Sequence, residues 1–164
     1  MNLFTDFLET PIGQMQLVAN EKAVVLLDFA DNTERIAKLL EQRFGVYNLE
    51  PRELAFTQTV QNYFAGQLKA LHNIPTETGG TVFQQQVWQA LLQIPIGQTW
   101  SYLALATHIG NQKATRAVGM TNGLNPISLI LPCHRVIGAN GKLTGYAGGI
   151  ERKKWLLEHE SRFL

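Results

Sequence analysis

The chain has 164 residues with a formal net charge of +1, and 45% of them are hydrophobic while 16% are charged. No apolar run approaches the roughly 20 residues that a membrane-spanning helix needs, and the first residues lack the basic start and apolar middle of a secretory signal. Because the chain has one cysteine, internal disulfides and zinc sites of several cysteines are excluded; we expect a cytoplasmic protein without a metal or a membrane segment.

The charge is distributed unevenly along the chain. Residues 1–77 carry ten acidic and six basic residues, whereas residues 78–164 carry three acidic and eight basic ones. No Asp or Glu occurs from Thr78 to Ile150. Such a segment can approach phosphates without repelling them, which favours nucleic-acid binding. A segment that is merely neutral and polar is the alternative.

The first 77 residues predict a small antiparallel sheet and two helices. Short segments rich in Val, Leu and Phe, separated by turn signals, predict strands at Leu3–Glu9, Gly13–Ala19 and Ala23–Phe29. Apolar residues at helical spacing predict helices at Thr33–Phe44 and Glu53–Ala65.

The character of the sequence changes after the polar segment Pro75–Gly80, so we expect domains at 1–77 and 78–164. Thr81 and Gln84 form a capping-box pattern at the start of the next helix. Two short helices, Ser101–His108 and Gln112–Asn122, follow around a glycine turn. This succession is typical of a helix-turn-helix, although ordinary helical proteins contain it too.

The second of these helices has an unusual outer face. Ala114, Ala117, Val118 and Gly119 are small, and Arg116 stands among them. Glycine within a helix costs roughly 1 kcal/mol of stability relative to alanine. The presence of Gly119 and other small residues on this face therefore calls for an explanation. Close packing against another helix is one reason; the charge distribution favours close approach to nucleic acid.

The remaining elements lead to and follow the single cysteine. They are a buried strand at Ile127–Leu131, a hairpin of Val136–Ile137 and Lys142–Leu143 around Asn140-Gly141, a flexible loop at Gly145–Gly149 and a helix at about Ile150–Glu160.

Cys133 is a candidate nucleophile. It follows Pro132 at the end of the predicted strand, within the segment that lacks acidic residues. Positive surroundings favour the thiolate, which is the reactive form of cysteine. The alternative is that Cys133 is a small buried apolar residue, as most lone cysteines in such proteins are.

His134 is a candidate base for Cys133. Adjacent side chains in an extended chain point to opposite sides, so a direct contact is not expected without a turn or a bridging water. A neutral imidazole near pH 7 could remove the thiol proton; a purely structural hydrogen bond is the alternative. Glu158 and Glu160 both have the chemistry to orient His134, and spacing does not choose between them.

Taken together, these segments resemble the O6-alkylguanine-DNA alkyltransferases, also called methylated-DNA–protein-cysteine methyltransferases, of the bacterial single-unit type. Pro132–Val136 is similar to the active-site signature of that family. Further similar segments, in the order and spacing of the family, are Arg116–Gly119, Asn125-Pro126, Gly145–Gly149 and Lys154–Glu160. The resemblance is specific over Thr81–Glu160 and loose over residues 1–77.

The resemblance implies an α+β fold, with a small N-terminal antiparallel sheet and helix that is ribonuclease-H-like in the family, and a mainly helical C-terminal domain containing the helix-turn-helix. It implies a single-turnover methylated-DNA–[protein]-cysteine S-methyltransferase that irreversibly moves the alkyl group of O6-alkylguanine, with O4-alkylthymine as a further candidate, to Cys133. Its partner would be double-stranded DNA, bound through the minor groove by a monomer, with no cofactor. The rival interpretations are a non-catalytic helix-turn-helix DNA-binding protein and a cysteine hydrolase.

The family's functional residues correspond to residues of this chain. The resemblance implies that Cys133 accepts the alkyl group, that His134 removes its proton through a water, that Glu160 polarises His134, that Asn125 holds the active-site turn and that Tyr102 helps protonate the departing guanine. The implied DNA contacts are Arg116, which fills the place of the extruded nucleotide, and Ala117, Gly119, Met120, Tyr102 and Arg135; the implied substrate pocket is Tyr146, Ala147 and Val136.

The sequence departs from its relatives at three points. No cysteine precedes Cys133, so the cysteine-containing zinc site of some relatives is absent. Some relatives have serine where this chain has Ala147 and proline where it has Ser128. The last two differences put the tolerance for bulky adducts in doubt, but not the basic reaction.

Overall fold

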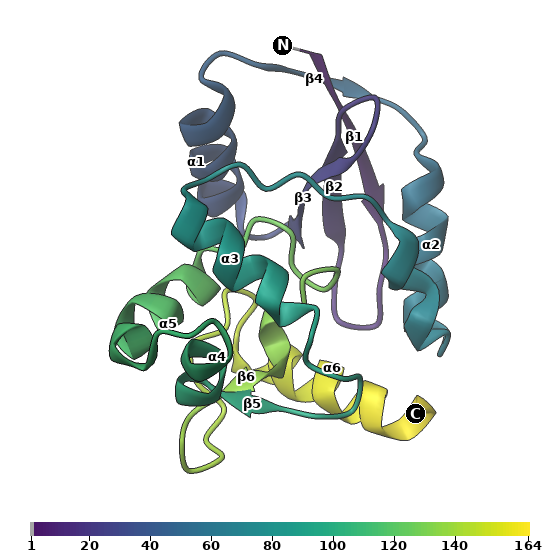
Figure 1. The fold of residues 1–164 in the computed structure, drawn as a ribbon. Coiled ribbons are helices and arrows are strands. Elements are labelled where there is room, and N and C mark those ends of the chain that lie inside the picture. The colour runs from purple at the N-terminus through teal and green to yellow at the C-terminus, as the bar shows by residue number, and fades with distance from the viewer. Residues whose placement is uncertain (1) are drawn as a thin grey trace.

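The N-terminal part is a four-stranded mixed sheet in the computed structural model, which describes residues 2–164 (Figure 1). The strands are β1 (Asn2–Leu8), β2 (Met15–Ala19), β3 (Val24–Phe29) and β4 (Asn48–Pro51), in the order β3-β2-β1-β4. The three antiparallel strands predicted from the sequence are present, but β4 pairs parallel to β1. The sheet is therefore not purely antiparallel. The sequence pattern missed β4 because it is largely exposed and ends in proline, which an edge strand tolerates.

Helices cover both faces of this sheet. Helix α1 (Thr33–Phe44) buries Ile36 and Leu40 against one face. The other face packs against α2 (Ala55–Phe64) and against the C-terminal part in one continuous core. Every residue of β3 is buried, as expected for a strand that is covered on both sides.

The C-terminal part is mainly helical, which confirms the α+β fold class. It contains α3 (Val82–Leu91), β5 (Trp100–Ser101), α4 (Tyr102–His108), η2 (Gln112–Ala114), α5 (Thr115–Gly123), η3 (Cys133–Arg135), β6 (Val136–Ile137) and α6 (Ile150–Phe163); η1 (Leu68–Asn73) precedes them. The predicted capping box at Thr81 and Gln84 is present. Helices α4 and α5 pack against each other and α3, joined by a turn with Gly110 at φ 78°.

Two predictions about residues 127–143 are wrong. Ile127–Leu131 is a tight turn rather than a strand, closed by a hydrogen bond from Leu131 N to Ile127 O of 3.1 Å, with Leu129 at φ 76°. The predicted hairpin is absent, since β6 pairs with β5 in parallel and residues 142–143 form no strand. Gly138 N still donates a hydrogen bond to Lys142 O across the turn at Asn140-Gly141. Both predictions failed because a short apolar segment can have the same sequence pattern in a strand and in a buried turn.

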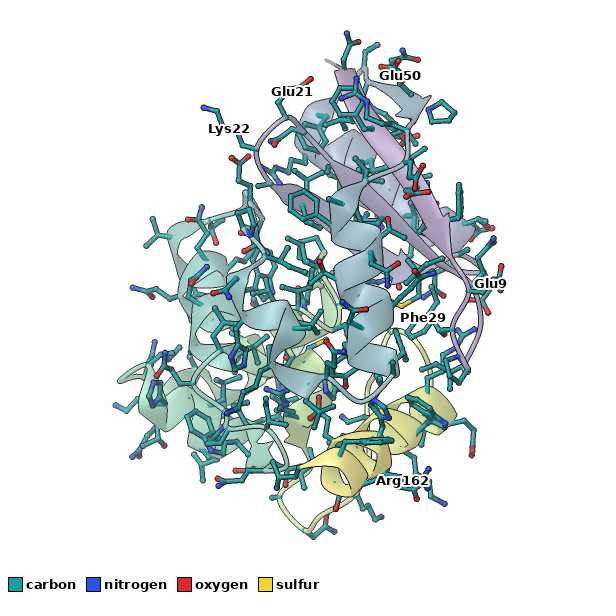
Figure 2. The ribbon with its side chains drawn as sticks, turned by 90° about the vertical axis from the view of Figure 1, so that its right-hand side faces the viewer. Glu9, Glu21, Lys22, Phe29, Glu50 and Arg162 are labelled. Carbon is teal, nitrogen blue, oxygen red and sulfur yellow. The ribbon has the colours of Figure 1, made fainter. Side chains whose placement is uncertain are left out.

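The two parts of the chain meet at the end of the sheet. Phe29, the last residue of β3, lies where the sheet approaches α6 (Figure 2). Its ring packs edge-on against Tyr146, with centroids 6.4 Å apart, and Arg152 of α6 lies over it. Glu21 and Glu50 lie at the far end of the molecule from α4 and α5 (Figure 2). Among residues 2–164, no helix combines the length and hydropathy that crossing a membrane requires.

Candidate active site

Cys133 begins η3, directly after the tight turn 127–131. Its thiol is free and its side chain almost completely buried, at 4% exposure. Burial raises the pKa of the Cys133 thiol, while the hydrogen bond with Asn125 and the charges of Arg35 and Lys153 lower it. Because burial outweighs these groups, the thiol is protonated at neutral pH, and its use as a nucleophile requires a base.

Asn125 holds the turn that presents Cys133. Its Nδ2 donates to Leu131 O at 2.7 Å, and its Oδ1 accepts from Ile127 N at 3.0 Å. The left-handed backbone of Leu129 costs on the order of 1 kcal/mol, so the turn needs such support. Asn125 is therefore placed for the holding role that the sequence predicted for it.

His134 and Glu160 form a buried hydrogen-bonded pair. His134 Nε2 lies 2.8 Å from Glu160 Oε2, and both side chains are essentially inaccessible. Arg135 also binds this carboxylate, with Nε at 2.8 Å from Oε1 and Nη2 at 2.9 Å from Oε2, and the Tyr63 hydroxyl donates to Oε2 at 2.8 Å. Glu158 is exposed. The geometry therefore selects Glu160 as the carboxylate that orients His134.

The charges at this pair leave His134 able to accept a proton. Burial would raise the pKa of Glu160, but His134 and Arg135 outweigh it and hold that pKa well below its usual range. Burial lowers the pKa of His134 more than Glu160 raises it, so the imidazole is neutral at pH 7. An ionised carboxylate only accepts hydrogen bonds, so Nε2 carries the hydrogen. His134 Nδ1 then holds the free lone pair, and it has no partner among the described residues.

The predicted pocket residues lie on the loop before α6 and on β6. Tyr146 is buried against Phe29, and Gly148 is tightly enclosed, since an added Cβ would come within 2.7 Å of both rings. The carbonyl of Ala147 accepts a 3.1 Å bond from Asn32 Nδ2. The loop is therefore fixed to the N-terminal part and is less free than its glycines suggest.

Helix α5 contacts the site on one side and has an exposed outer face on the other. Arg116, Ala117 and Met120 are exposed, with Met120 at 67%. On the inner face, Asn122 Nδ2 reaches the Cys133 carbonyl at 3.4 Å. Helix α5 is thus in direct contact with the segment that carries the nucleophile.

Tyr102 connects α5 with the pocket loop. It begins α4, its ring lies 3.5 Å from where a Cβ on Gly119 would be, and its hydroxyl donates to Thr144 O at 3.4 Å. A Cβ at position 119 would therefore make ordinary van der Waals contact with this ring.

Known proteins are similar to this chain over its whole length. The family model described as 6-O-methylguanine DNA methyltransferase, DNA binding domain, matches residues 82–162, and the model of its ribonuclease-like domain matches residues 3–78. The chain belongs to the 6-O-methylguanine DNA methyltransferase family. A methylated-DNA–protein-cysteine methyltransferase of Salmonella typhimurium is 41% identical over 169 residues, covering 100% of this chain and 99% of that protein. One of Methanosarcina barkeri is 42% identical, covering 99% of each.

Solved structures of this family have the same fold. The crystal structure of Mycobacterium tuberculosis OGT in complex with DNA has a TM-score of 0.84 and 41% identity, covering 99% of this chain and 94% of that one. The O6-methylguanine-DNA methyltransferase of the archaeon Pyrococcus kodakaraensis has a TM-score of 0.75 at 24% identity, which indicates a shared fold.

The structure contradicts one predicted DNA contact of this alkyltransferase. Arg135 is 6% exposed, its fork is bound to Glu160, and its Nη1 donates to Ile94 O at 3.1 Å. A guanidinium occupied in this way does not reach DNA. The family resemblance implied this contact; the partner that binds Arg135 comes from α6, 25 residues later along the chain.

Sequence reasoning also missed two polar residues beside the site. Lys153 is fully buried; its Nζ donates to Val136 O at 2.5 Å and Thr144 O at 2.8 Å, tying β6 to the pocket loop. Burial lowers the pKa of Lys153 to about 8, against the raising effect of Cys133. Tyr63 lies within the helix predicted at Glu53–Ala65, where no pattern marks its hydroxyl as a partner of Glu160. The signal that could have found Lys153 is its place on the buried face of α6, three residues before Leu156.

Proposed function

We propose that this protein repairs DNA by moving the methyl or other alkyl group of O6-alkylguanine, with O4-alkylthymine as a further candidate, to the Sγ of its own Cys133. The observation that carries the proposal is the buried Cys133, which is followed in the chain by an oriented, neutral His134 and is bonded through its carbonyl to Asn122 of α5. Family membership and the full-length similarity to methylated-DNA–protein-cysteine methyltransferases support the same reaction.

The reaction is an in-line displacement at the alkyl carbon. The Cys133 thiol gives its proton to His134 Nδ1 through a bridging water, and Glu160 stabilises the imidazolium that forms. The Sγ–C bond forms as the C–O6 bond breaks, and the departing guanine takes up a proton with the help of Tyr102. The thioether product has no step that regenerates the thiol, so each molecule acts once, and the reaction uses no cofactor.

We further propose that a monomer binds double-stranded DNA with the outer face of α5 in the minor groove. Ala117 and Gly119 allow close approach, and Arg116 and Met120 are exposed to contact the duplex. A base inside a duplex must be extruded before it can react, which costs a few kcal/mol, and Arg116 offsets part of this cost by taking its place in the stack. The relative from Mycobacterium tuberculosis has been solved in complex with DNA. In this proposal residues 78–164 form the DNA-binding and acceptor domain and residues 1–77 its companion.

The direct test is the stoichiometry of repair. A duplex with one O6-methylguanine is incubated with increasing amounts of protein, and restored guanine is measured by chromatography. We expect repair to stop at about one lesion per protein molecule. Binding without loss of the methyl group would instead support a non-catalytic DNA-binding protein, and repeated turnover would contradict an acceptor that is consumed.

Replacing Arg116 by Ala should weaken repair of duplex DNA selectively. Part of the extrusion cost is then no longer offset, so we expect the single-turnover rate on duplex to fall about tenfold, which corresponds to about 1.4 kcal/mol. The rate on free O6-methylguanine, which needs no extrusion, should stay within about twofold. Lys113→Ala, which removes another exposed cation near α5, is the matched control. An equal loss on both substrates would assign Arg116 to the chemistry instead.

The pH dependence of transfer should report His134. Because burial places the pKa of His134 below 6.5, the imidazole is neutral through pH 7 and is protonated only in more acidic solution. We therefore expect the rate on free O6-methylguanine to be flat from about pH 7 to 8.5 and to fall below about pH 6.5. A rate that rises about tenfold per pH unit through this range would indicate an unassisted thiol with a raised pKa.

A further inference from the structure

A buried ion pair of the N-terminal part lies against the turn that presents Cys133. Asp28, next to last in β3, is completely buried, and Arg35 stands in the first turn of α1. Arg35 Nη1 lies 2.7 Å from Asp28 Oδ2. The other carboxylate oxygen, Oδ1, accepts from Phe29 N at 2.8 Å and from Asn32 Nδ2 at 3.1 Å. Asp28 thus has partners on both oxygens and fixes the orientation of the guanidinium.

The other arm of Arg35 binds the C-terminal part at two points. Nη2 donates to the carbonyl oxygens of Gly123 and Asn125, both at 3.0 Å. Gly123 is the last residue of α5, where carbonyls have no partner within the helix and a cation is favourable. Asn125 is the residue whose side chain spans the 127–131 turn. One guanidinium therefore joins the end of the DNA-facing helix to the support of the nucleophile.

The same network reaches the pocket loop. Asn32 Nδ2, which donates to Asp28, also donates to the Ala147 carbonyl. Three separate pieces of the site (the end of α5, the Asn125 turn and the loop before α6) are thus connected to the carboxylate of Asp28. Arg35 connects the end of α5 with the Asn125 turn.

We propose that Arg35, oriented by Asp28, is a positioning residue for alkyl transfer and that through it the N-terminal part sets the place of Cys133 relative to α5. This inference rests on the proposed function. Arg35 acts through Asn125 and does not touch the reacting atoms. The role requires the planar fork of arginine, because one group must bind a carboxylate and two carbonyls together; a lysine ammonium keeps the charge but not this geometry.

The test uses two variants that avoid leaving a buried charge without a partner. Arg35→Lys keeps the cation, and Asp28→Asn combined with Arg35→Gln removes both charges. For each, circular dichroism checks that the protein is folded at the assay temperature. Single-turnover transfer is then measured on duplex O6-methylguanine and on free O6-methylguanine. Arg43→Lys is the matched control, since Arg43 is on the same helix and binds Glu77, away from the active-site turn.

We expect both Arg35 variants to lose about tenfold in saturating rate on both substrates, because small displacements of a reacting group cost this much or more. The Kd for duplex DNA should stay within about threefold, since the outer face of α5 is unchanged. Arg43→Lys should match the wild type. Folded Arg35 variants that transfer at the wild-type rate would overturn the proposal and leave the pair a merely structural role.

Hydrogen exchange separates this proposal from the proposed function. In the Arg35 variants the amides of Ile127 and Leu131, which are bonded within the turn, should exchange at least tenfold faster than in Arg43→Lys. If the wild type transferred nothing while this exchange still changed, the reaction would be wrong but the coupling of Arg35 to the turn would stand. Unchanged exchange in both variants would overturn the coupling itself.

Discussion

A Cys133→Ala protein should leave O6-methylguanine in DNA untouched and still bind the duplex. The chain has no second cysteine that could serve as the acceptor. Transfer should therefore fall below detection, as expected when the sole nucleophile is removed. Because Cys133 is 4% exposed, it contributes little surface to DNA. The Kd measured by fluorescence anisotropy on a methylated duplex should stay within about twofold.

The most informative comparison for this variant is Cys133→Ser, which keeps a similar volume but a far weaker nucleophile. Both variants should bind alike, and neither should repair. Residual transfer by Cys133→Ala, with the methyl group recovered on protein, would require a different acceptor and would remove the basis of the proposed mechanism. Loss of DNA binding in both would mean that the thiol region belongs to the DNA-contacting surface.

Glu160→Gln should impair transfer and stability together. The neutral amide no longer stabilises a protonated His134, so we expect a loss of about 100-fold in the transfer rate. It also leaves the Arg135 guanidinium buried without a counter-charge, which costs about 3 kcal/mol in the free energy of unfolding. Urea denaturation at pH 7 and single-turnover transfer measure the two effects. Glu158→Gln, an exposed change on the same helix, should cost less than about 0.5 kcal/mol.

The stability difference should depend on pH in a definite direction. The pKa of Glu160 is lower in the folded protein than its ordinary value of 4.5. Its stabilising contribution is therefore complete above about pH 4.5 and is lost as the pH falls from there toward the folded-state pKa. The wild type and Glu160→Gln should consequently converge in stability below about pH 4.5. A difference that stayed constant down to pH 3 would contradict the ion pair as its source.

What the sequence predicted well depends on residues that are close together in the chain. The capping box of Thr81 and Gln84 and the helix Thr33–Phe44 follow from local patterns, and both are present. Asn125 was assigned through the family resemblance; its side chain bonds to Leu131 and Ile127, which lie within six residues of it. Interactions between residues close in the chain determine such features, so a single sequence is enough to predict them.

The predictions that failed depend on partners far away in the chain. The family resemblance implied a DNA contact for Arg135, and only the packing of α6 reveals that its guanidinium is paired with Glu160. Arg35 carried no functional signal, since its roles come from carbonyls 88 and 90 residues later. Spacing left Glu158 and Glu160 equivalent; burial of one and exposure of the other separates them.

The most direct measurement follows the methyl group itself. The protein is incubated with a duplex whose O6-methylguanine carries an isotopically labelled methyl group, then digested, and the label is located by mass spectrometry. We predict S-methylcysteine at Cys133, reaching about one methyl group per protein molecule as guanine is restored in the DNA. A label on any other residue, or guanine restored with no label on the protein, would contradict transfer to Cys133.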